Sequence, residues 1–459
     1  MPHACRVAGA RIGVRIAASG YSHVVSTIAL PPPPVDDPHG VARWVAAHLG
    51  DLCSDDPAPS PTFRGGQRAA DAALAALDVR GYARWRNEVW PRERRGATGL
   101  SPWIRHGLLT LPRVWEAVEG GPSADVDKLR DELLWQEYSR HLYARLGSRL
   151  RAPLRADPPT AGDASPEQAW DRRMACMDLT VGELEDEGWV PNQARLWLAG
   201  QWAVRHGLDW REGEQRFFAH LLDGSRAANG TGWQWAVGTG TGRPYGFSRR
   251  QVERRAPGLC QTCPLASRCP IETPPEVELD RREPDPLLRR DPDPEATGGP
   301  RTAQVAGAPE LVWLTAESLG EDDPALLAHP DVPAAFVFDA PLLARLALSG
   351  KRLVFLAETL AELATTRTVH LWRGDPVAAL AGTSLATTFA PVPGWRARSA
   401  RLDVAALHPW PWLRRPHEGP LQSFTAWRKH VEGGSRGGGS RGKGSSRGGG
   451  GSRGRGRRR

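Results

Sequence analysis

The chain has 459 residues, of which 40% are hydrophobic, so it is long enough for two or three domains with cores of their own. Its 60 Lys and Arg outnumber its 52 Asp and Glu, but residues 433–459 hold nine basic residues and no acidic one. The rest of the chain is close to neutral, at about −1, which excludes a uniformly basic, histone-like protein. The sequence has no Gly-X-Y period, no sustained heptad and no apolar run of about 18 residues, which excludes collagen, coiled coils and membrane-spanning proteins.

Residues 1–39 are expected to form a disordered or leader-like extension. Residues 1–35 hold Arg6, Arg11 and Arg15 but no acidic residue, and they include the run Pro31–Pro34. The arginines interrupt any apolar core of a secretory signal peptide. An organelle transit peptide remains the alternative to a disordered extension.

Residues 40–270 are predicted to be a helical domain. Apolar residues recur at i, i+3 and i+4 in four stretches, which is typical of helices with one buried face. The stretches are residues 41–52, 70–77, 126–146 and 194–208.

The pattern changes after a Pro-rich and charge-rich stretch, residues 271–308, which is predicted to be a linker. Residues 309–430 then alternate short β-type runs with helical stretches, which predicts a doubly wound α/β domain with a parallel sheet. The strands are expected at residues 310–314, 334–339, 352–356 and 368–374, and the helices at 323–330 and 358–364. Residues 431–459, rich in Gly, Arg and Ser, are expected to be a disordered basic tail.

Three of the six cysteines, Cys260, Cys263 and Cys269, lie within ten residues. This crowding indicates metal ligation in a reducing compartment, such as the cytoplasm, rather than a disulfide framework. Three closely spaced thiolates with a remote fourth are typical of iron–sulfur ligation, and four thiolates also suit zinc. Cys5 and Cys53 are assigned no role.

Four ordered motifs in the helical region together resemble the FAD-binding domain of the DNA photolyase/cryptochrome family. They are residues 63–77, 96–110, 131–142 and 188–247. The resemblance implies an all-α FAD-binding photolyase-type domain, followed here by a smaller doubly wound (Rossmann-like) α/β domain. That second domain resembles the antenna-binding half of the family, in permuted order.

The usual arginines after the first strand of the antenna half are absent from this chain. Thr315, Ala316 and Glu317 stand in their place. The antenna pigment is therefore unknown, and its presence is not assigned.

The resemblance implies noncovalent FAD and places residues on two sides of it. The phosphate side has Tyr82, Arg86, Thr98 and Ser101, and the ring side has Asn192, Arg195, Asp223 and Asn229. Hydroxyls and backbone N–H groups at a helix start suit phosphates, and a cation–carboxylate pair suits the polar edge of a reduced flavin. The chain departs from the family at Ala97, Gln193 and Ser225, where Thr, Arg and Asp are usual.

The resemblance also implies residues that act on DNA and on electrons. Glu132, Trp135 and Trp235 match positions that hold a pyrimidine lesion flipped out of the duplex. Trp233 and Trp210 match the first two members of an electron-transfer chain of tryptophans. The third member falls within residues 147–169, which contain no Trp, and Trp197 or Trp202 is the alternative.

Iron–sulfur photolyases of bacteria place their remote cysteine where this chain has Cys176. The resemblance therefore implies a [4Fe–4S] cluster on Cys176, Cys260, Cys263 and Cys269. Structural zinc and no metal at all remain alternatives.

These residues together predict FAD-dependent, light-driven repair of UV-induced pyrimidine lesions, a deoxyribodipyrimidine photolyase-like lyase activity that uses electron transfer from reduced flavin. The alternatives are a cryptochrome-like photoreceptor without repair and a nucleic-acid-binding flavoprotein without catalysis. Glu132, Trp135, Asn229 and Trp235 are of the repair type. The pattern does not distinguish cyclobutane dimers from (6-4) lesions.

The expected partners are UV-damaged DNA, and nucleic-acid phosphates for the basic tail. RNA, or no partner at all, is the alternative for the tail. The chain is expected to act as a monomer in the cytoplasm, without a membrane partner.

Overall fold

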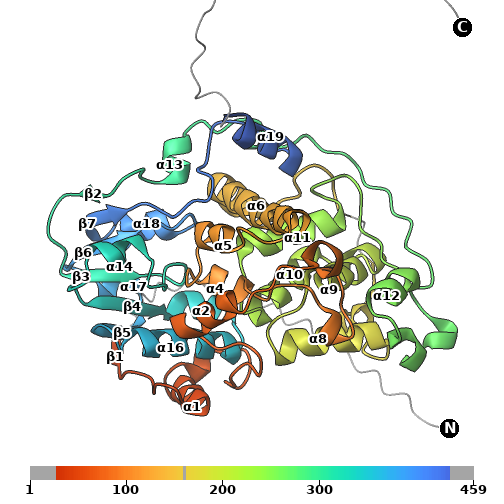
Figure 1. Cartoon of the computed structure of the whole chain (residues 1–459), viewed down its shortest axis with the longest axis horizontal. Coiled ribbons are helices and arrows are strands. Elements are labelled where there is room, and N and C mark those ends of the chain that lie inside the picture. The colour runs from red at the N-terminus through yellow and green to blue at the C-terminus, as the bar shows by residue number, and fades with distance from the viewer. Residues whose placement is uncertain (1–26, 159–161, 435–459) are drawn as a thin grey trace, which may run out of the picture.

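The computed structural model describes residues 27–158 and 162–434, which form a helical body packed against a sheet with its own helices (Figure 1). The predicted extension lies outside the described residues up to residue 26, and the predicted tail lies outside them beyond Gly434.

The helical body is built around α6, its longest helix. Buried positions such as Val126, Leu129 and Leu133 recur in α6 every three or four residues, as the apolar pattern predicts. α6 ends where Gly147 takes a φ of 57°, a conformation that favours glycine. The helices of the body are α2 (Gln67–Ala75), α3 (Tyr82–Trp85), α4 (Ser101–Arg105), α5 (Leu111–Ala117), α6 (Ser123–Leu146), α7 (Pro166–Ala169), α8 (Ala175–Asp186), α9 (Asn192–Ala199), α10 (Trp210–His220), α11 (Arg226–Val237) and α12 (Arg249–Arg255).

The sheet has seven strands in the order β1-β5-β4-β3-β6-β7-β2. Five neighbouring strands are parallel: β3 (Leu311–Leu314), β4 (Ala334–Asp339), β5 (Val369–Gly374), β6 (Ser384–Thr388) and β7 (Asp403–His408). β3 lies in the middle, the next two strands follow on one side and the last two on the other. This is the doubly wound arrangement predicted for residues 309–430. The order reverses between β3 and β6, and in such sheets ligands bind outside the carboxyl ends of the strands at this point.

The predicted strand at residues 352–356 is wrong, because these residues lie in the helix α16 (Gly350–Leu363). Almost every residue of α16 is buried, on all sides of the helix rather than on one face, and Lys351, Arg352 and Glu358 are buried among its apolar residues. A short apolar run cannot distinguish a buried strand from a buried helix. The other helices of the α/β unit are α14 (Pro324–Ala328), α15 (Ala340–Leu346), α17 (Pro376–Ala379) and α18 (Trp395–Ser399).

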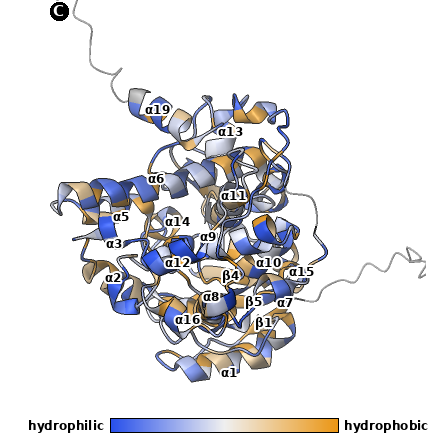
Figure 2. Ribbon diagram, turned by 90° about the vertical axis from the view of Figure 1, so that its right-hand side faces the viewer, coloured by the Kyte–Doolittle hydropathy of each residue, from blue (hydrophilic) through white to orange (hydrophobic). Residues whose placement is uncertain are grey.

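The beginning of the described chain belongs to the α/β unit rather than to the helical body. β1 (Ile28–Leu30) pairs antiparallel with β5, and α1 (Pro38–Leu49) packs against α16 (Figure 2). Trp44, Val45 and Leu49 share a core with the strands. The predicted extension is therefore ordered over residues 27–39, and residues 40–52 pack outside the domain to which the sequence assigns them. The sequence pattern at α1 predicts a helix but does not indicate its neighbour.

The predicted linker, residues 271–308, runs around the outside of the helical body to α13 (Pro294–Gly298) and the edge strand β2 (Gln304–Val305) (Figure 1). Its Leu288 is buried, and its Asp291 pairs with Arg145 of α6 at 3.1 Å between two nearly inaccessible side chains. The final described element, α19 (Phe424–Gly434), returns to the helical body and lies along α6.

Within residues 27–158 and 162–434, no helix is both long enough and apolar enough to cross a membrane.

Candidate functional site

A cavity of about 870 Å³ lies where the helical body meets the carboxyl edge of the sheet. Its volume is within the range of ligand-binding cavities, roughly 300–1,000 Å³. The predicted flavin, lesion and electron-transfer residues that line it are Tyr82, Arg86, Thr98, Ser101, Glu132, Trp135, Asn192, Arg195, Asp223, Asn229, Trp233 and Trp235. The fold thus brings together side chains from α3, near the start of the helical body in sequence, and from α11, near its end. Trp210 is not among the lining residues.

The phosphate-side residues come from α3, α4 and the loop between them. The Ser101 hydroxyl accepts a hydrogen bond from Trp189 Nε1 at 3.0 Å, and the Thr98 hydroxyl lies 3.4 Å from the N–H of Leu100. Tyr82 is buried, and this burial raises the pKa of its phenol. These contacts hold neutral hydroxyls at the cavity wall, where they can donate to an anion.

The ring-side residues differ in exposure: Asp223 and Asn229 are buried, Arg195 is half-buried, and Asn192 is exposed. Arg195 donates to Asp223 at 2.7 Å, and also to the carbonyl of Val190 at 3.0 Å. Asp223 Oδ1 and Asn229 Nδ2 are buried, yet neither has a hydrogen-bond partner in the described part of the chain. Buried polar atoms are normally paired, so these two atoms point to a polar ligand.

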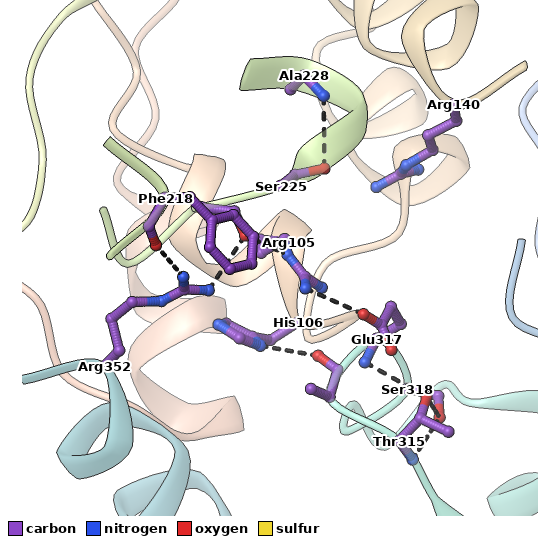
Figure 3. A network of polar contacts seen from close by, with 12 residues as sticks. Arg105, His106, Arg140, Phe218, Ser225, Ala228, Thr315, Glu317, Ser318 and Arg352 are labelled. Atoms are coloured by element: carbon purple, nitrogen blue, oxygen red, sulfur yellow. Dashed lines mark hydrogen bonds and ion pairs between the residues drawn. The ribbon is translucent and has the colours of Figure 1, made fainter. Parts of the chain in front are cut away.

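Ser225, where the family usually has Asp, is the N-cap of α11. Its hydroxyl lies 3.4 Å from the N–H of Ala228 (Figure 3), and Ser225 lines the cavity. A serine here caps the helix without adding a negative charge to the site.

Arg352 of α16 connects the α/β unit to the loop that carries Asp223 (Figure 3). Its buried guanidinium donates to the carbonyls of Phe218 and Gly224, the latter at 3.1 Å. Burial and, to a smaller extent, the neighbouring Arg105 together lower the pKa of Arg352 to about 9. The position of Asp223 therefore depends on a residue from the other unit.

Arg105 and His106, from the helical body, contact the segment that follows β3 in the α/β unit (Figure 3). Arg105 donates to the carbonyl of Gly224 at 2.8 Å and pairs with Glu317 at 3.0 Å. The His106 ring lies 2.8 Å from the carbonyl of Ala316. These contacts fix the segment after β3 against the cavity wall.

Sequence reasoning missed most of the positive charge in the cavity. Eight arginines and four acids line it. The arginines that the sequence did not single out are Arg105, Arg140, Arg226, Arg345, Arg352 and Arg398. Half of them come from the α/β unit, which no local sequence signal placed beside the flavin motifs. The excess of cations favours an anionic ligand.

The predicted lesion residues lie at the cavity wall in three different settings. Glu132 pairs with Lys128 at 3.0 Å and with Arg86 at 3.2 Å. Trp235 is 40% exposed, and it is the one tryptophan among the exposed large apolar residues of the described chain. Trp135 is half-buried and stacks on Phe424 of α19, with ring centroids 4.0 Å apart and planes at 12°.

The predicted electron-transfer tryptophans, Trp233 and Trp210, are both buried. Trp233 contacts Phe217 edge-on at 5.1 Å, and Phe217 contacts Trp170 at 6.0 Å. Trp170 in turn lies 4.9 Å from Trp202, one of the two alternatives for the missing third member. Trp170 follows directly after the stretch in which that member was sought, and the sequence did not single it out.

The four predicted metal ligands line a second, small cavity of about 20 Å³. Burial and, to a smaller extent, the nearby Cys260, Cys263 and Cys269 together raise the pKa of the Cys176 thiol to about 12. The N–H of Ala175, at the start of α8, donates to Cys263 Sγ at 3.4 Å. In the described residues, no three His, Cys, Asp or Glu side chains are arranged to hold a metal ion.

Comparison with known proteins shows that part of the helical body is similar to a known family. Residues 129–252 match the family described as the FAD binding domain of DNA photolyase. The deoxyribodipyrimidine photo-lyase of one strain of Thermus thermophilus is 35% identical over 226 residues, which are 46% of this chain and 52% of that protein. The chain spans about half the length of the curated relatives it matches.

Other relatives show the same partial coverage. The deoxyribodipyrimidine photo-lyase of Vibrio cholerae is 28% identical over 47% of this chain and 50% of its own length. Cryptochrome DASH of Idiomarina loihiensis is 27% identical over 46% of this chain and 48% of its own length. A solved cryptochrome from Synechocystis sp. aligns with 43% of this chain and 44% of its own, at 23% identity and a TM-score of 0.39.

Proposed function

We propose that this chain binds FAD in the cavity between the helical body and the sheet, and that it repairs UV-induced pyrimidine lesions in DNA with light. The observation that carries the proposal is the pair of unpartnered buried atoms, Asp223 Oδ1 and Asn229 Nδ2. Both residues line the cavity and belong to the matched segment 129–252. The similarity to deoxyribodipyrimidine photo-lyases supports the activity.

The residues present fit FAD. Thr98, Ser101 and Arg86 would hold its phosphates, since they supply hydroxyls and a cation at one wall. Arg195, Asp223 and Asn229 would hold the polar edge of its ring system. Reduced FAD, when bound, supplies an electron on absorbing light.

The chain's own residues would bind and orient the lesion. Trp135 and Trp235 offer aromatic surfaces on which unpaired bases can stack. Glu132 is held by Lys128 and Arg86, so its carboxyl group is fixed in direction at the wall. A protonated carboxyl would donate to a base carbonyl, whereas an ionised one would accept from a base N–H.

The direct test is repair of DNA that contains one defined lesion. Protein with chemically reduced FAD is mixed with a duplex containing a single cyclobutane thymine dimer, and the dimer is counted after light and after darkness. We expect loss of the dimer in light only. A parallel duplex with a (6-4) lesion tests the alternative substrate. No loss of either lesion in light, with FAD bound, would contradict the repair activity.

A light-sensing flavoprotein without repair is the second candidate function. The similarity to cryptochrome DASH supports it. It predicts normal binding and photoreduction of FAD without loss of either lesion.

For the α/β unit, we propose that it corresponds to the antenna half of the family in permuted order. The doubly wound sheet and the cavity at its carboxyl edge support this assignment. No antenna pigment is assigned.

For the four cysteines, we propose a [4Fe–4S] cluster on Cys176, Cys260, Cys263 and Cys269. Their shared cavity supports this assignment, and thiolate is the ligand that such a cluster requires. Iron and acid-labile sulfide should be found in the purified protein and lost in Cys176→Ser but kept in Cys53→Ser. Zinc in place of iron, or a full cluster in Cys176→Ser, would overturn the assignment. A reducing compartment, the cytoplasm, follows from the same proposal.

A further inference from the structure

Trp135 makes an aromatic contact that the proposed function leaves unexplained. Phe424 stacks on one face of its indole at 4.0 Å, and Tyr138 meets it edge-on at 5.7 Å and 81°. Trp135 lines the large cavity, whereas Phe424 is not among the lining residues. The surface that Trp135 offers to the cavity is therefore the part of its ring that Phe424 does not cover.

The helix that carries Phe424 is anchored to α6 on several sides. Trp427 is fully buried, and its Nε1 donates to His141 at 3.0 Å. Tyr138 donates its hydroxyl to the carbonyl of Leu421 at 2.8 Å, and Arg428 pairs with Asp131. α19 thus presents Phe424 from a fixed position.

The contact joins segments that are far apart in the chain. Trp135 belongs to the helical body, whereas Phe424 follows the whole α/β unit. The wall of the cavity at Trp135 is therefore incomplete without the C-terminal helix.

We propose that Phe424 is a positioning residue, which holds the Trp135 indole so that its uncovered surface stacks on the unpaired base of damaged DNA. This inference rests on the proposed function. An indole that is braced on one face loses less rotational freedom when a base stacks on it. A stacked aromatic pair is worth about fivefold in an equilibrium constant.

The test is binding in the dark by full-length, FAD-loaded protein. The dissociation constants are measured for a duplex with a single cyclobutane thymine dimer and for the same duplex without it. Phe424→Leu keeps most of the apolar volume but removes the ring, Phe424→Tyr keeps the ring, and Thr425→Ala changes the next, exposed residue on the same helix. We expect Phe424→Leu to lower the discrimination between the duplexes by about fivefold. Phe424→Tyr and Thr425→Ala should keep it, and all variants should keep their FAD.

A double-mutant cycle shows whether Phe424 acts through Trp135. In a Trp135→Ala background, Phe424→Leu should have no further effect on discrimination. An additional loss of the same size there, or wild-type discrimination in Phe424→Leu, would overturn the inference and leave the proposed function standing. Equal affinity of the wild type for both duplexes would overturn the proposed function and the inference with it.

Discussion

Asp223 and Asn229 are the residues on which the flavin assignment depends most. Each has a buried polar atom without a hydrogen-bond partner in the described chain, and such an atom normally costs about 1–3 kcal/mol. The partner of Asp223, Arg195, is itself only half-buried, so the pair remains open to the cavity. A ligand with donors and acceptors at its edge would satisfy both atoms.

Asp223→Asn should lower the FAD content of the purified protein severalfold. The substitution leaves Arg195 without its charged partner and removes a carboxylate from the polar edge of the site. FAD is measured by absorbance per chain, and thermal unfolding reports any general loss of structure. Asp178→Asn, in an exposed pair with Arg172, is the matched control. Full FAD content in Asp223→Asn would show that this carboxylate does not contact the flavin.

At the scale of elements, α16 and α19 connect parts of the molecule that are distant in sequence. α16 donates through Arg352 to the loop before α11, and α19 covers one face of Trp135 on α6. Both helices come from the C-terminal half of the chain. The walls of the cavity therefore depend on elements outside the matched segment 129–252.

Arg352→Gln should destabilise the protein by about 1–3 kcal/mol, because it removes the charged donor of the buried Phe218 carbonyl and leaves the Gly224 carbonyl with Arg105 alone. The change is read from denaturant unfolding of the full chain. Arg43→Gln, in an exposed pair with Asp37, should change stability by less than about 1 kcal/mol. Equal stability of Arg352→Gln and the wild type would mean that this contact does not hold the two units together.

The anchor of α19 should weaken in acid. His141 must be neutral, because its Nδ1 accepts from Trp427 while its Nε2 donates to the carbonyl of Arg414 at 2.7 Å. Burial and, to a smaller extent, the nearby His417, Arg145 and Arg140 together lower the pKa of His141 from 6.5 to about 3. The folded state thus binds fewer protons than the unfolded state between these values. Its stability is full above pH 6.5 and falls as the pH drops toward 3.

The free energy of unfolding, measured at intervals from about pH 7 to about pH 4, checks this expectation. His141→Leu cannot take up the proton in either state, so its stability should fall less steeply than that of the wild type. His39→Gln, which removes an exposed imidazole, is the matched control. Parallel slopes for His141→Leu and the wild type would contradict the assignment.

At the scale of the whole molecule, the sequence predicts where the long helices lie along the chain, but it does not predict which elements pack against one another. α6 and the strands β3, β4 and β5 appear where periodicity places them. β6 and β7 were not predicted, because their Ala- and Thr-containing runs are short and lack a strong apolar signal.

The sequence predicted the residues on only one wall of the cavity, the wall formed by the helical body. Motifs along the helical body identified Asn192, Asp223 and Asn229 because their spacing is local. Arg352 and Phe424 reach the cavity or its wall through tertiary packing, which leaves no local pattern in the sequence. The placement of α1 against α16 was unpredictable for the same reason.

The basic tail, residues 433–459, gives the whole molecule its net positive charge. We propose that it binds nucleic-acid phosphates by charge alone, because it contains no aromatic residue on which bases could stack. Deleting it should weaken binding to undamaged DNA and flatten the dependence of the affinity on salt. A tail of equal length with its nine basic residues changed to Gln should behave like the deletion. An unchanged salt slope would mean that the tail does not contact DNA.

The central claim is that the cavity between the helical body and the sheet holds noncovalent FAD. The most direct measurement is acid precipitation of the purified wild-type protein, with FAD determined in the supernatant and in the pellet. We predict about one FAD per chain, all of it in the supernatant. A colourless supernatant, or flavin that remains in the pellet, would contradict the claim.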